Sequence, residues 1–442
     1  MLNISKGAKK ALSMLHLAGY EAYCVGGCVR DMIMGREVND FDITTNATPE
    51  EMKTVFKNER ILETGIKHGT LTLLYEGEPI EITTYRIDGE YEDSRHPSNV
   101  SFTRNLKDDL SRRDFTMNAL VYNESEGVLD LFNGKEDIEK KQIRAIGNPY
   151  ARFKEDALRI LRAIRFSSTL SFEIEKETKN AMVECAPLLH KIAGERIQVE
   201  LEKFLLGKNV KNAILENYEI LGILCPEIAK MKNFNQHNKW HIYDILEHTA
   251  VAVESAPPVP HIRLAMLLHD TGKVHTFTRD ERGVGHFYGH NDKSAEIARE
   301  FLNKYKYDNF TKSEVYNLVK VHDTHTELDR VLVKKRLNRM GKNRFLDLIK
   351  IQRADNMAQN PELVNLAHFD SLEKMANDIL NESCFSLASL KVNGSDLMAI
   401  GIPAGKEIGF ILNTLLSEVI EEKIENEREA LLKRANEIKN ES

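Results

Sequence analysis

The stretch VGGCVRDMIMGREVNDFDITT, residues 25–45, decides the fold of the first part of the chain. It predicts a strand, a Gly-Gly turn, the start of a helix, and a second strand that begins with two aspartates. Asp40 and Asp42 are one residue apart on that strand, so their carboxylates project from the same face. Paired hard oxygen ligands suit one or two magnesium ions. The stretch therefore predicts a metal site at a strand end.

The glycine turn in the same stretch predicts a phosphate site. Gly26 and Gly27 lack side chains, so backbone amides at the start of the helix can approach a triphosphate closely. Arg30 follows one turn into that helix. A lone Gly-Gly turn is usually only a turn, and a lone DxD is usually a strand edge. The two together at this spacing favour a site that binds a triphosphate through Gly27 and Arg30.

The segments around this stretch predict an α/β domain followed by helices. Apolar residues recur with helical spacing over residues 4–18 and stop at Gly19. Short predicted strands and helices then alternate: EAYCVGG, DFDITT, GTLTLLYE and PIEITTYR read as strands, and VRDMIMG and PEEMKTVFKN as helices. From about residue 150 the helical period dominates. Residues 255–260 predict a turn between two helices, and residues 406–440 predict one long charged helix.

Composition excludes several classes of protein. The 442 residues suggest about three domains, and no stretch approaches the roughly 20 apolar residues of a membrane span. The net charge of −7 argues against an indiscriminate polycationic nucleic-acid binder, so positive charge for RNA must be local. Five scattered cysteines are too few for a disulfide framework. We expect reduced thiols and a cytoplasmic location.

The GGxVRD element followed by DFD resembles the signature of the DNA polymerase β nucleotidyltransferase superfamily, in the branch that holds class II CCA-adding enzymes and bacterial poly(A) polymerases. Further matches to this branch follow in family order through the first 205 residues: ETGIKHGT at 63–70, RRDFTMNAL at 112–120, DLFNGKEDI at 130–138, EDALRILRAIRF at 155–166 and GERIQVELEKFL at 194–205. The resemblance implies an α+β fold with a polymerase-β-like head of mixed sheet and helices, then an all-helical neck, an HD-type body and a tail. The expected boundaries are 1–145, 146–235, 236–360 and 361–442.

The resemblance also implies an activity. It is the template-independent addition or repair of the 3′-terminal CCA of tRNA from CTP and ATP, with release of pyrophosphate. Asp40 and Asp42 would be the catalytic residues and would bind Mg²⁺, with Glu81 in IEITTYR as the candidate third carboxylate. The expected partners are tRNA lacking all or part of its 3′ CCA, CTP and ATP, with no membrane. Monomer and homodimer both stay open.

Asp156 and Arg159 predict selection of the incoming base. Spaced i, i+3 on a predicted helix, they would present an acceptor beside a donor on one face. Cytosine and adenine offer an amino donor next to a ring-nitrogen acceptor, whereas uracil and guanine would leave groups unpaired. An ordinary surface ion pair is the alternative for an arbitrary DxxR. The resemblance favours an amino-acid template that takes the place of a nucleic-acid one.

Neighbouring residues carry further nucleotide roles by the same resemblance. Arg113 would contact the nucleotide, and Asp114 the ribose 2′-hydroxyl. Residues 152–165 hold five basic and two acidic side chains, which predicts a positive strip, including Arg162 and Arg165, that faces phosphates. The polar stretch 87–109 resembles the flexible loop that CCA-adding enzymes use to switch from C to A.

Two related products remain as alternatives. A CC-adding enzyme is disfavoured because such relatives shorten or lack the loop at 87–109. A poly(A) polymerase is disfavoured because ETGIKHGT resembles the CCA-adding pattern more closely and because the C-terminal part is not strongly basic.

A second constellation of histidines and aspartates lies in residues 241–355. The order H…HD…D resembles the HD metal-dependent phosphohydrolase superfamily, some members of which form part of class II CCA-adding enzymes. The implied metal ligands are His248, His269, Asp270 and Asp355, with His290 and His322 as additional candidates, for a divalent transition metal or Mg²⁺. From another class, the chain could be mainly such a hydrolase with a regulatory nucleotide-binding head, or a non-catalytic tRNA-binding module.

Residues 330–350 form the most basic stretch of the second half. They hold eight basic side chains against the single acid Asp347. A strip of this kind suits an RNA backbone, and the alternative is a solvated helix face.

Overall fold

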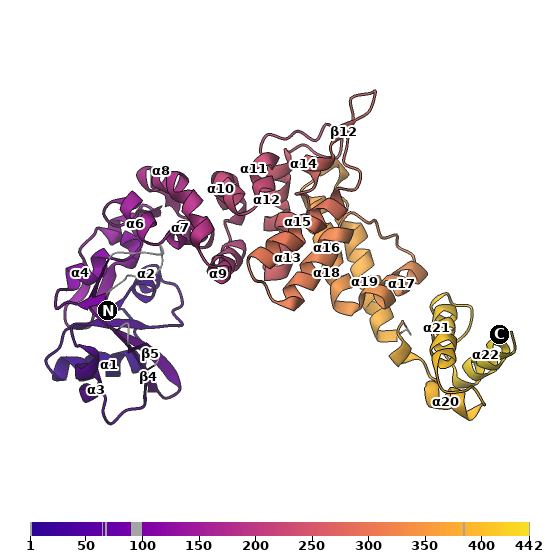
Figure 1. Cartoon of the computed structure of the whole chain (residues 1–442), viewed down its shortest axis with the longest axis horizontal. Coiled ribbons are helices and arrows are strands. Elements are labelled where there is room, and N and C mark those ends of the chain that lie inside the picture. The colour runs from indigo at the N-terminus through magenta and orange to yellow at the C-terminus, as the bar shows by residue number, and fades with distance from the viewer. Residues whose placement is uncertain (1, 64, 67–68, 90–99, 383–384, 442) are drawn as a thin grey trace. The chain divides into compact units, whose positions relative to one another are not determined.

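The computed structural model describes residues 2–63, 65–66, 69–89, 100–382 and 385–441 (Figure 1). It divides into two compact units, residues 1–229 and 230–442, and each is described by itself. Residues 146–229 of the predicted neck lie in the same unit as the predicted head, and the predicted domain boundaries stay predictions. Among the described residues, no helix is both long and apolar enough to cross a membrane.

Unit 1 is built on a mixed sheet of seven strands in the order β3-β4-β5-β2-β1-β8-β9. Only β2 and β5 run parallel, and every other neighbouring pair is antiparallel. The strands are β1 (Ala22–Val25), β2 (Asp42–Thr45), β3 (Ile61–Leu62), β4 (Thr70–Tyr75), β5 (Glu78–Thr84), β8 (Leu120–Asn123) and β9 (Gly127–Asp130). The sheet confirms the predicted mixed α+β head.

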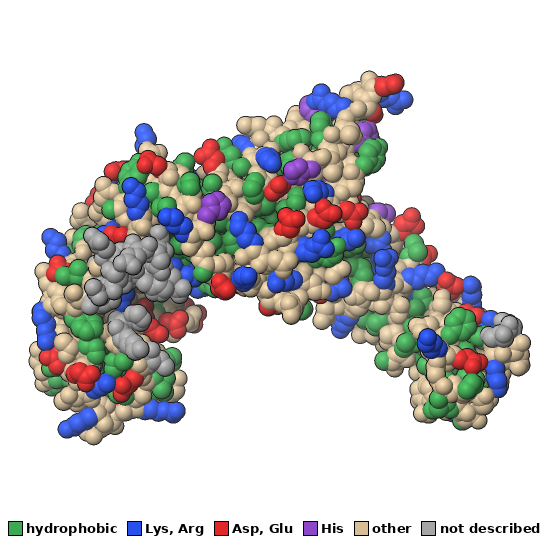
Figure 2. All heavy atoms as spheres, in the orientation of Figure 1, with side chains coloured by type: hydrophobic (Ala, Val, Ile, Leu, Met, Phe, Trp, Pro, Cys, Tyr) green, Lys and Arg blue, Asp and Glu red, His purple; other side chains and the backbone are tan. Residues whose placement is uncertain are grey.

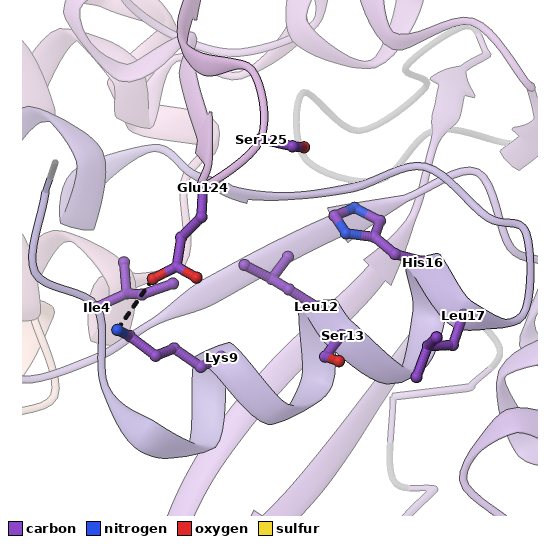
Figure 3. Close-up of a pocket in the computed structure, with 8 residues that line it drawn as sticks. All are labelled: Ile4, Lys9, Leu12, Ser13, His16, Leu17, Glu124 and Ser125. Carbon is purple, nitrogen blue, oxygen red and sulfur yellow. Dashed lines mark ion pairs between the residues drawn. The ribbon is translucent and has the colours of Figure 1, made fainter.

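The first helix of unit 1 shows how local sequence signals set its bounds. In α1 (Lys6–Leu17), the Ser5 hydroxyl accepts a hydrogen bond from the Ala8 amide at 3.0 Å, and the chain turns at Gly19 with φ +89°. Beside α1 lies a pocket of about 350 Å³ whose mouth carries an ion pair between Lys9 and Glu124 at 2.9 Å (Figure 3). None of the predicted site residues lines this pocket.

Of the other helices of unit 1, the first alternate with the strands, and the later ones follow one another along the chain. They are α2 (Gly27–Ile33), α3 (Pro49–Val55), α4 (Leu106–Ser111), α5 (Gly134–Glu139), α6 (Pro149–Glu155), α7 (Leu158–Leu170), α8 (Lys176–Cys185), α9 (Gly194–Leu205) and α10 (Val210–Leu224), with α11 (Pro226–Met231) at the division between the units. The short strands β6 (Arg86–Asp88) and β7 (Val100–Phe102) pair within the predicted flexible loop. Residues 90–99 of that loop, and residues 64, 67 and 68 of the ETGIKHGT motif, lie outside the described residues.

Unit 2 is almost entirely helical. Its helices are α12 (Ile245–Ser255), α13 (Pro260–Leu268), α14 (Lys273–Thr276), α15 (His290–Lys304), α16 (Asn309–Val321), α17 (Arg330–Met340), α18 (Lys342–Met357), α19 (Leu366–Glu382), α20 (Gly394–Ala399), α21 (Lys406–Ile420) and α22 (Arg428–Glu441). The predicted turn at 255–260 is confirmed, because α12 ends at Ser255 and α13 begins at Pro260.

Two pairs of very short strands accompany the helices. β10 (Gln142–Ile143), within the predicted head, pairs with β11 (Glu173–Ile174) of the predicted neck, and β12 (Thr278–Arg279) pairs with β13 (Gly285–His286) in unit 2. Strands of two residues are too short to show an alternating pattern.

The long helix predicted over 406–440 is instead α21 and α22. The chain takes a left-handed conformation at Glu422, with φ +58°. Glu421 and Glu422 pair there with Lys335 and Lys334 of α17, at 2.7 and 2.8 Å. These tertiary contacts hold the break, which no glycine or proline marks in the sequence.

Candidate active site and metal cluster

Three carboxylates come together at one end of the central strands of unit 1. Phe41 is buried between Asp40 and Asp42, which are both exposed, so the two aspartates share a face. In the parallel pair of β2 and β5, Asp42 lies opposite Glu81, which is also exposed. Partial burial, then the charges of Glu81 and Asp40, raise the pKa of the Asp42 carboxyl against the opposing charge of Arg113. A group of like charges of this kind fits a divalent cation.

The Gly-Gly turn lies beside these carboxylates and leaves room for Arg113. Gly26 has φ +81°, and a Cβ atom there would lie 3.0 Å from an Arg113 guanidinium nitrogen. Gly27 begins α2. Burial lowers the pKa of Arg113, while the charges of Asp109 and Asp42 oppose that shift. The turn therefore places a cationic group near the three carboxylates.

Arg30 is buried and already bound to side chains of unit 1. Its Nη1 donates to Asn118 Oδ1 at 2.7 Å, and its Nε and Nη2 donate to Asp31 at 3.0 and 2.8 Å. Asn118 in turn donates through Nδ2 to Asp114 Oδ1 at 2.9 Å. These bonds use three of the five N–H donors of the guanidinium, and a contact of Arg30 with a triphosphate stays a prediction. Asn118 was missed, although it stands in the RRDFTMNAL motif.

The helix predicted to carry both Asp156 and Arg159 is interrupted. Asp156 has φ −139° and ψ 100° and lies between the end of α6 and the start of α7. Its carboxylate accepts from the Leu158 amide at 3.0 Å and from Arg196 at 2.8 Å. The prediction that the two residues share a face of one helix is wrong, because this capping interaction starts a new helix at Leu158.

Arg159 is also bound within unit 1. It is 8% exposed and donates to Glu155 at 2.8 Å and to the carbonyls of Arg152 and Arg112 at 3.1 and 2.8 Å. Asp156 and Arg159 are thus each held by other groups, and their role toward a base stays a prediction.

The arginines predicted to form a positive strip are paired with acids. Arg152 and Arg159 both contact Glu155, and Arg165 lies 3.3 Å from Glu200. Arg162 lies 2.6 Å from Asp114. The strip is therefore largely ion-paired, by Glu155 within it and by Asp114 and Glu200 from other segments. Glu200 and Arg196 were missed as partners, although both stand in the GERIQVELEKFL motif.

Asp114 is the most constrained acid of this region. It is 8% exposed, and its Oδ1 accepts from Asn118 and from the Phe115 amide, while its Oδ2 accepts from Arg162 Nε at 2.7 Å. Although burial raises the pKa of Asp114, the Arg162 charge and these bonds hold it well below its usual range. The predicted ribose contact would have to share an oxygen that is already bonded.

Unit 2 brings the predicted HD ligands into one buried cluster. His248 Nε2 lies 3.0 Å from Asp355 Oδ1 and 3.4 Å from Asp270 Oδ2. His269 Nε2 lies 3.2 Å from Asp270 Oδ2 and 3.3 Å from Asp355 Oδ1. All four predicted ligands therefore face a common point, although they come from α12, the end of α13, and α18.

The two additional candidates face the other oxygen of Asp270. His290 Nε2 and His322 Nε2 lie 3.5 and 3.8 Å from Asp270 Oδ1. Two compact groups suited to a metal ion thus share Asp270: one with His248 and His269, the other with His290 and His322.

Each histidine of this cluster is oriented by a backbone carbonyl on its far side. The Nδ1 atoms lie 2.6–3.1 Å from carbonyl oxygens: His248 from Ala358, His269 from Met266, His290 from Phe287 and His322 from Val319. Donation from Nδ1 leaves Nε2 as a lone-pair donor toward the centre, which is the tautomer that a metal ligand needs.

The buried negative charge of the cluster requires a cation. Burial opposes protonation of His269, but the charges of Asp270 and Asp355 raise its pKa to about 10. Among the described residues, no well-directed hydrogen bond reaches either Asp270 oxygen, although Lys273 Nζ lies 2.7 Å from Oδ2. A proton on His269 or a divalent metal ion can balance these carboxylates. Lys273 was missed, although it follows directly in HDTGK.

The cluster opens to a pocket of about 370 Å³. Its lining includes Asp270, Lys273, Tyr288, His290 and Asp355. The donor set can therefore be reached by a small molecule.

The basic stretch 330–350 is mostly ion-paired. Five of its eight basic side chains contact acids: Arg330, Lys334, Lys335, Arg344 and Lys350. Figure 2 shows red and blue side chains interspersed over the visible face. Folding therefore pairs most of this charge with acids, and a contact of the stretch with RNA stays a prediction.

Three family models match the chain. The Poly A polymerase head domain matches residues 22–144, a probable RNA- and SrmB-binding site of polymerase A matches residues 171–232, and a putative tRNA nucleotidyltransferase domain 2 matches residues 277–435. Among solved structures, the chain is similar to the Bacillus stearothermophilus CCA-adding enzyme in complex with CTP. The TM-score is 0.75 at 28% identity, covering 98% of this chain and 97% of that one. A Thermotoga maritima CCA-adding enzyme complexed with tRNA shares the fold, with a TM-score of 0.60 at 22% identity over 97% and 93% of the two chains.

Curated relatives extend along nearly the whole chain. The CCA-adding enzyme of Limosilactobacillus fermentum is 35% identical over 432 residues, which are 98% of this chain and 96% of that protein. The enzyme of Levilactobacillus brevis is 36% identical over 96% of both chains. The match to the enzyme of Limosilactobacillus reuteri is 47% identical but spans 54% of this chain and 60% of that protein. The chain therefore belongs to the CCA-adding enzyme family.

Proposed function

We propose that this protein adds or repairs the 3′-terminal CCA of tRNA in the cytoplasm, using CTP and ATP and releasing pyrophosphate. The observation that carries the proposal is the set of Asp40, Asp42 and Glu81 on one face of β2 and β5. Family membership over nearly the full length of two curated relatives supports it. Those relatives and the B. stearothermophilus enzyme bear the name of CCA-adding enzymes.

The three carboxylates fit a divalent cation, and we propose that Mg²⁺ is the ion. Carboxylate oxygens are its preferred protein ligands, and the site is open at the sheet end. When bound, the metal lowers the pKa of the RNA 3′-hydroxyl and neutralises charge on the triphosphate. The backbone amides at Gly27 and the guanidinium of Arg113 would orient the triphosphate beside it. The chain itself forms no covalent bond to the nucleotide in this scheme.

Base selection would fall to Asp156 and Arg159. In the nucleotide-bound state, we propose that Asp156 accepts from the amino group of C or A and Arg159 donates to the adjacent ring nitrogen. Arg196 and Glu155, which hold these side chains now, would then act as positioning residues. A uracil or guanine would leave buried polar groups unpaired, which disfavours it strongly.

An incorporation assay on tRNA that ends before CCA tests this function. With CTP alone, we expect two nucleotides to be added. With ATP alone, we expect no extension, and with both, addition should stop after three. A long A tail would instead identify a poly(A) polymerase, and a stop after two C residues in the presence of ATP would identify a CC-adding enzyme.

The buried cluster of unit 2 supports a second candidate function, a metal-dependent phosphohydrolase of HD type. The carrying observation is that four Nε2 atoms converge on Asp270 while their Nδ1 atoms face carbonyl oxygens. Imidazole and carboxylate together suit a divalent transition metal or Mg²⁺. When bound, the metal would activate water for attack on a phosphoester. Lys273, beside Asp270 in the pocket, would stabilise the charge on the phosphate.

Metal content tests this second function separately from the first. We expect His248→Ala combined with His269→Ala to abolish tight divalent-metal binding, measured by elemental analysis after dialysis. CCA addition should be unchanged. His190→Ala, an exposed histidine of unit 1, is the control and should retain the metal. Equal metal content in the cluster variant and the control would contradict the assignment of these histidines as metal ligands. If the variant loses the metal but the wild type does not hydrolyse a nucleoside 2′,3′-cyclic phosphate, only the choice of that substrate is contradicted.

A further inference from the structure

A second pocket of unit 2, of about 520 Å³, is lined almost entirely by basic and neutral side chains. It lies among α16, α17 and α18, and four of its lining residues are cationic: Lys320, Arg336, Arg339 and Arg344. Within the described part of the chain, no carboxylate lines it. We call it the arginine pocket. A hollow of this size with this lining suits an anionic group rather than an apolar ligand.

Arg336 is held by backbone carbonyls and has no ion pair with an acid among the described residues. Its Nη1 and Nη2 donate to the carbonyls of Thr324 and His325 at 3.3 and 2.7 Å. Arg339 lies three residues on along α17, is exposed, and has no acidic partner among the residues described. Burial, then the charge of Arg339, lowers the pKa of Arg336. Two like charges are thus held near each other, and a bound anion would relieve their repulsion.

The other two cations of the pocket are anchored at its rim. Arg344 makes a two-pronged contact with Glu314, with Nε at 3.0 Å and Nη2 at 2.6 Å from its two oxygens. Lys320 lies 3.2 Å from Asp292. Their charges are therefore partly compensated, and Arg336 and Arg339 carry the uncompensated charge.

Only some of the basic side chains in residues 330–350 have acidic partners. Arg330 and Lys335, on the same helix α17, are paired with Glu422 and Glu421. Three of the eight basic side chains of 330–350 have no ion pair among the described residues, Arg336, Arg339 and Lys342, and the first two of them line the pocket. Planar guanidinium groups match the paired oxygens of a phosphate, and a ring such as that of Tyr316 can cover the attached sugar or base.

We propose that the arginine pocket binds a backbone phosphate of the RNA substrate. The proposal rests on the proposed function, which supplies that substrate, and it adds a contact on the unit that holds none of the nucleotidyl-transfer carboxylates. The alternative source of the same chemistry is the phosphate of a free nucleotide, which the experiment separates.

The test replaces both unpaired arginines, Arg336→Gln with Arg339→Gln. The matched control is Arg330→Gln with Lys335→Gln, which removes the same charge from exposed, ion-paired positions of the same helix. We expect the pocket variant to bind tRNA lacking CCA about tenfold more weakly than the control. The slope of log affinity against log salt should fall by about one. KM for tRNA should rise, while kcat and KM for CTP should match those of the control.

Arg339→Gln alone guards against misfolding, because it leaves in place the hydrogen bonds by which Arg336 holds the carbonyls of Thr324 and His325 before α17. It should weaken tRNA binding in the same direction with an unchanged thermal unfolding temperature. Equal tRNA affinities of the pocket variants and the control would overturn the inference. It would also be overturned if the pocket variants bound ATP more weakly than the control while their affinity for tRNA stayed the same. The wild-type protein is assayed for tRNA extension before any variant is compared. If it does not extend tRNA, the proposed function is overturned.

Discussion

Asp42→Asn should lower kcat for nucleotide incorporation by about a thousandfold or more, because it removes a ligand worth several kcal/mol of transition-state charge stabilisation. The substitution keeps the size of the side chain and removes only its charge. Asp42 lies opposite Glu81 in the parallel pair, and the charges of Glu81 and Asp40 raise the pKa of its carboxyl, so its neutralisation also relieves repulsion. The measurement is single-turnover addition of CMP to tRNA that ends before CCA.

Stability separates a catalytic loss from a folding defect in this variant. We expect the metal-free Asp42→Asn protein to unfold at the same temperature as the wild type or a higher one, whereas binding of Mg²⁺ to unit 1 should weaken. Glu139→Gln, an exposed acid on α5, is the matched control and should leave incorporation and metal affinity unchanged. Incorporation that persists at the wild-type rate in Asp42→Asn would refute the catalytic assignment.

Arg162→Met should destabilise unit 1 by about 3 kcal/mol. Asp114 is nearly buried, and removal of Arg162 leaves its charge without the partner that lies 2.6 Å away. Two hydrogen bonds to Asp114 remain, which keeps the loss at the lower end of the range for broken buried pairs. Urea denaturation followed by far-ultraviolet circular dichroism gives the free energy of unfolding. The single tryptophan, Trp240, lies in unit 2, so its fluorescence serves as an internal reference.

A double-mutant cycle and an exposed pair provide the controls for that prediction. Asp114→Asn in the Arg162→Met background should recover most of the lost stability, since no buried charge then remains. Arg104→Met removes a similar contact, to Glu51, but its side chain is 56% exposed, and we expect a cost below about 1 kcal/mol. Equal costs for Arg162→Met and Arg104→Met would contradict the structural role of the buried pair.

The same pair sets a pH dependence with a definite sign. The pKa of Asp114 is lowered in the folded protein, so its stabilising contribution is complete above the unfolded value of about 3.9 and falls as the pH drops below it. Arg162→Met removes the charge that opposes burial, which raises the folded pKa. The variant should therefore lose less stability than the wild type as the pH falls below about 4, because much of the contribution is already absent.

The sequence predicted best what depends on short periods. A period of two placed Asp40 and Asp42 on one face, and a strand, turn and helix formed where residues 25–45 indicated. The histidines of unit 2 were found because each stands in its own short motif. The sequence could not place Glu81 opposite Asp42, since a register between distant strands leaves no local pattern.

What the sequence could not predict depends on contacts over long separations. The pairing of the arginines of α7 could not be predicted, because Asp114 and Glu200 approach them from 48 and 35 residues away along the chain. At Asp156 the local bond to the Leu158 amide is joined by an ion pair from Arg196, and at Glu422 the break is held by Lys334 of α17. None of these sites contains the glycine or proline that normally marks the end of a helix.

The hydrogen bonds behind the histidines of unit 2 bear on which positions can vary. His269, His290 and His322 each direct Nδ1 to the carbonyl oxygen three residues earlier, at Met266, Phe287 and Val319. The hydrogen-bond partner of each Nδ1 is a main-chain oxygen, so the orientation of the ring does not depend on the side chain at those three positions. It is also set within one turn of each ring, so loss of one histidine leaves the other rings aimed as before. Such a cluster can exchange one ligand at a time over evolution without losing its geometry.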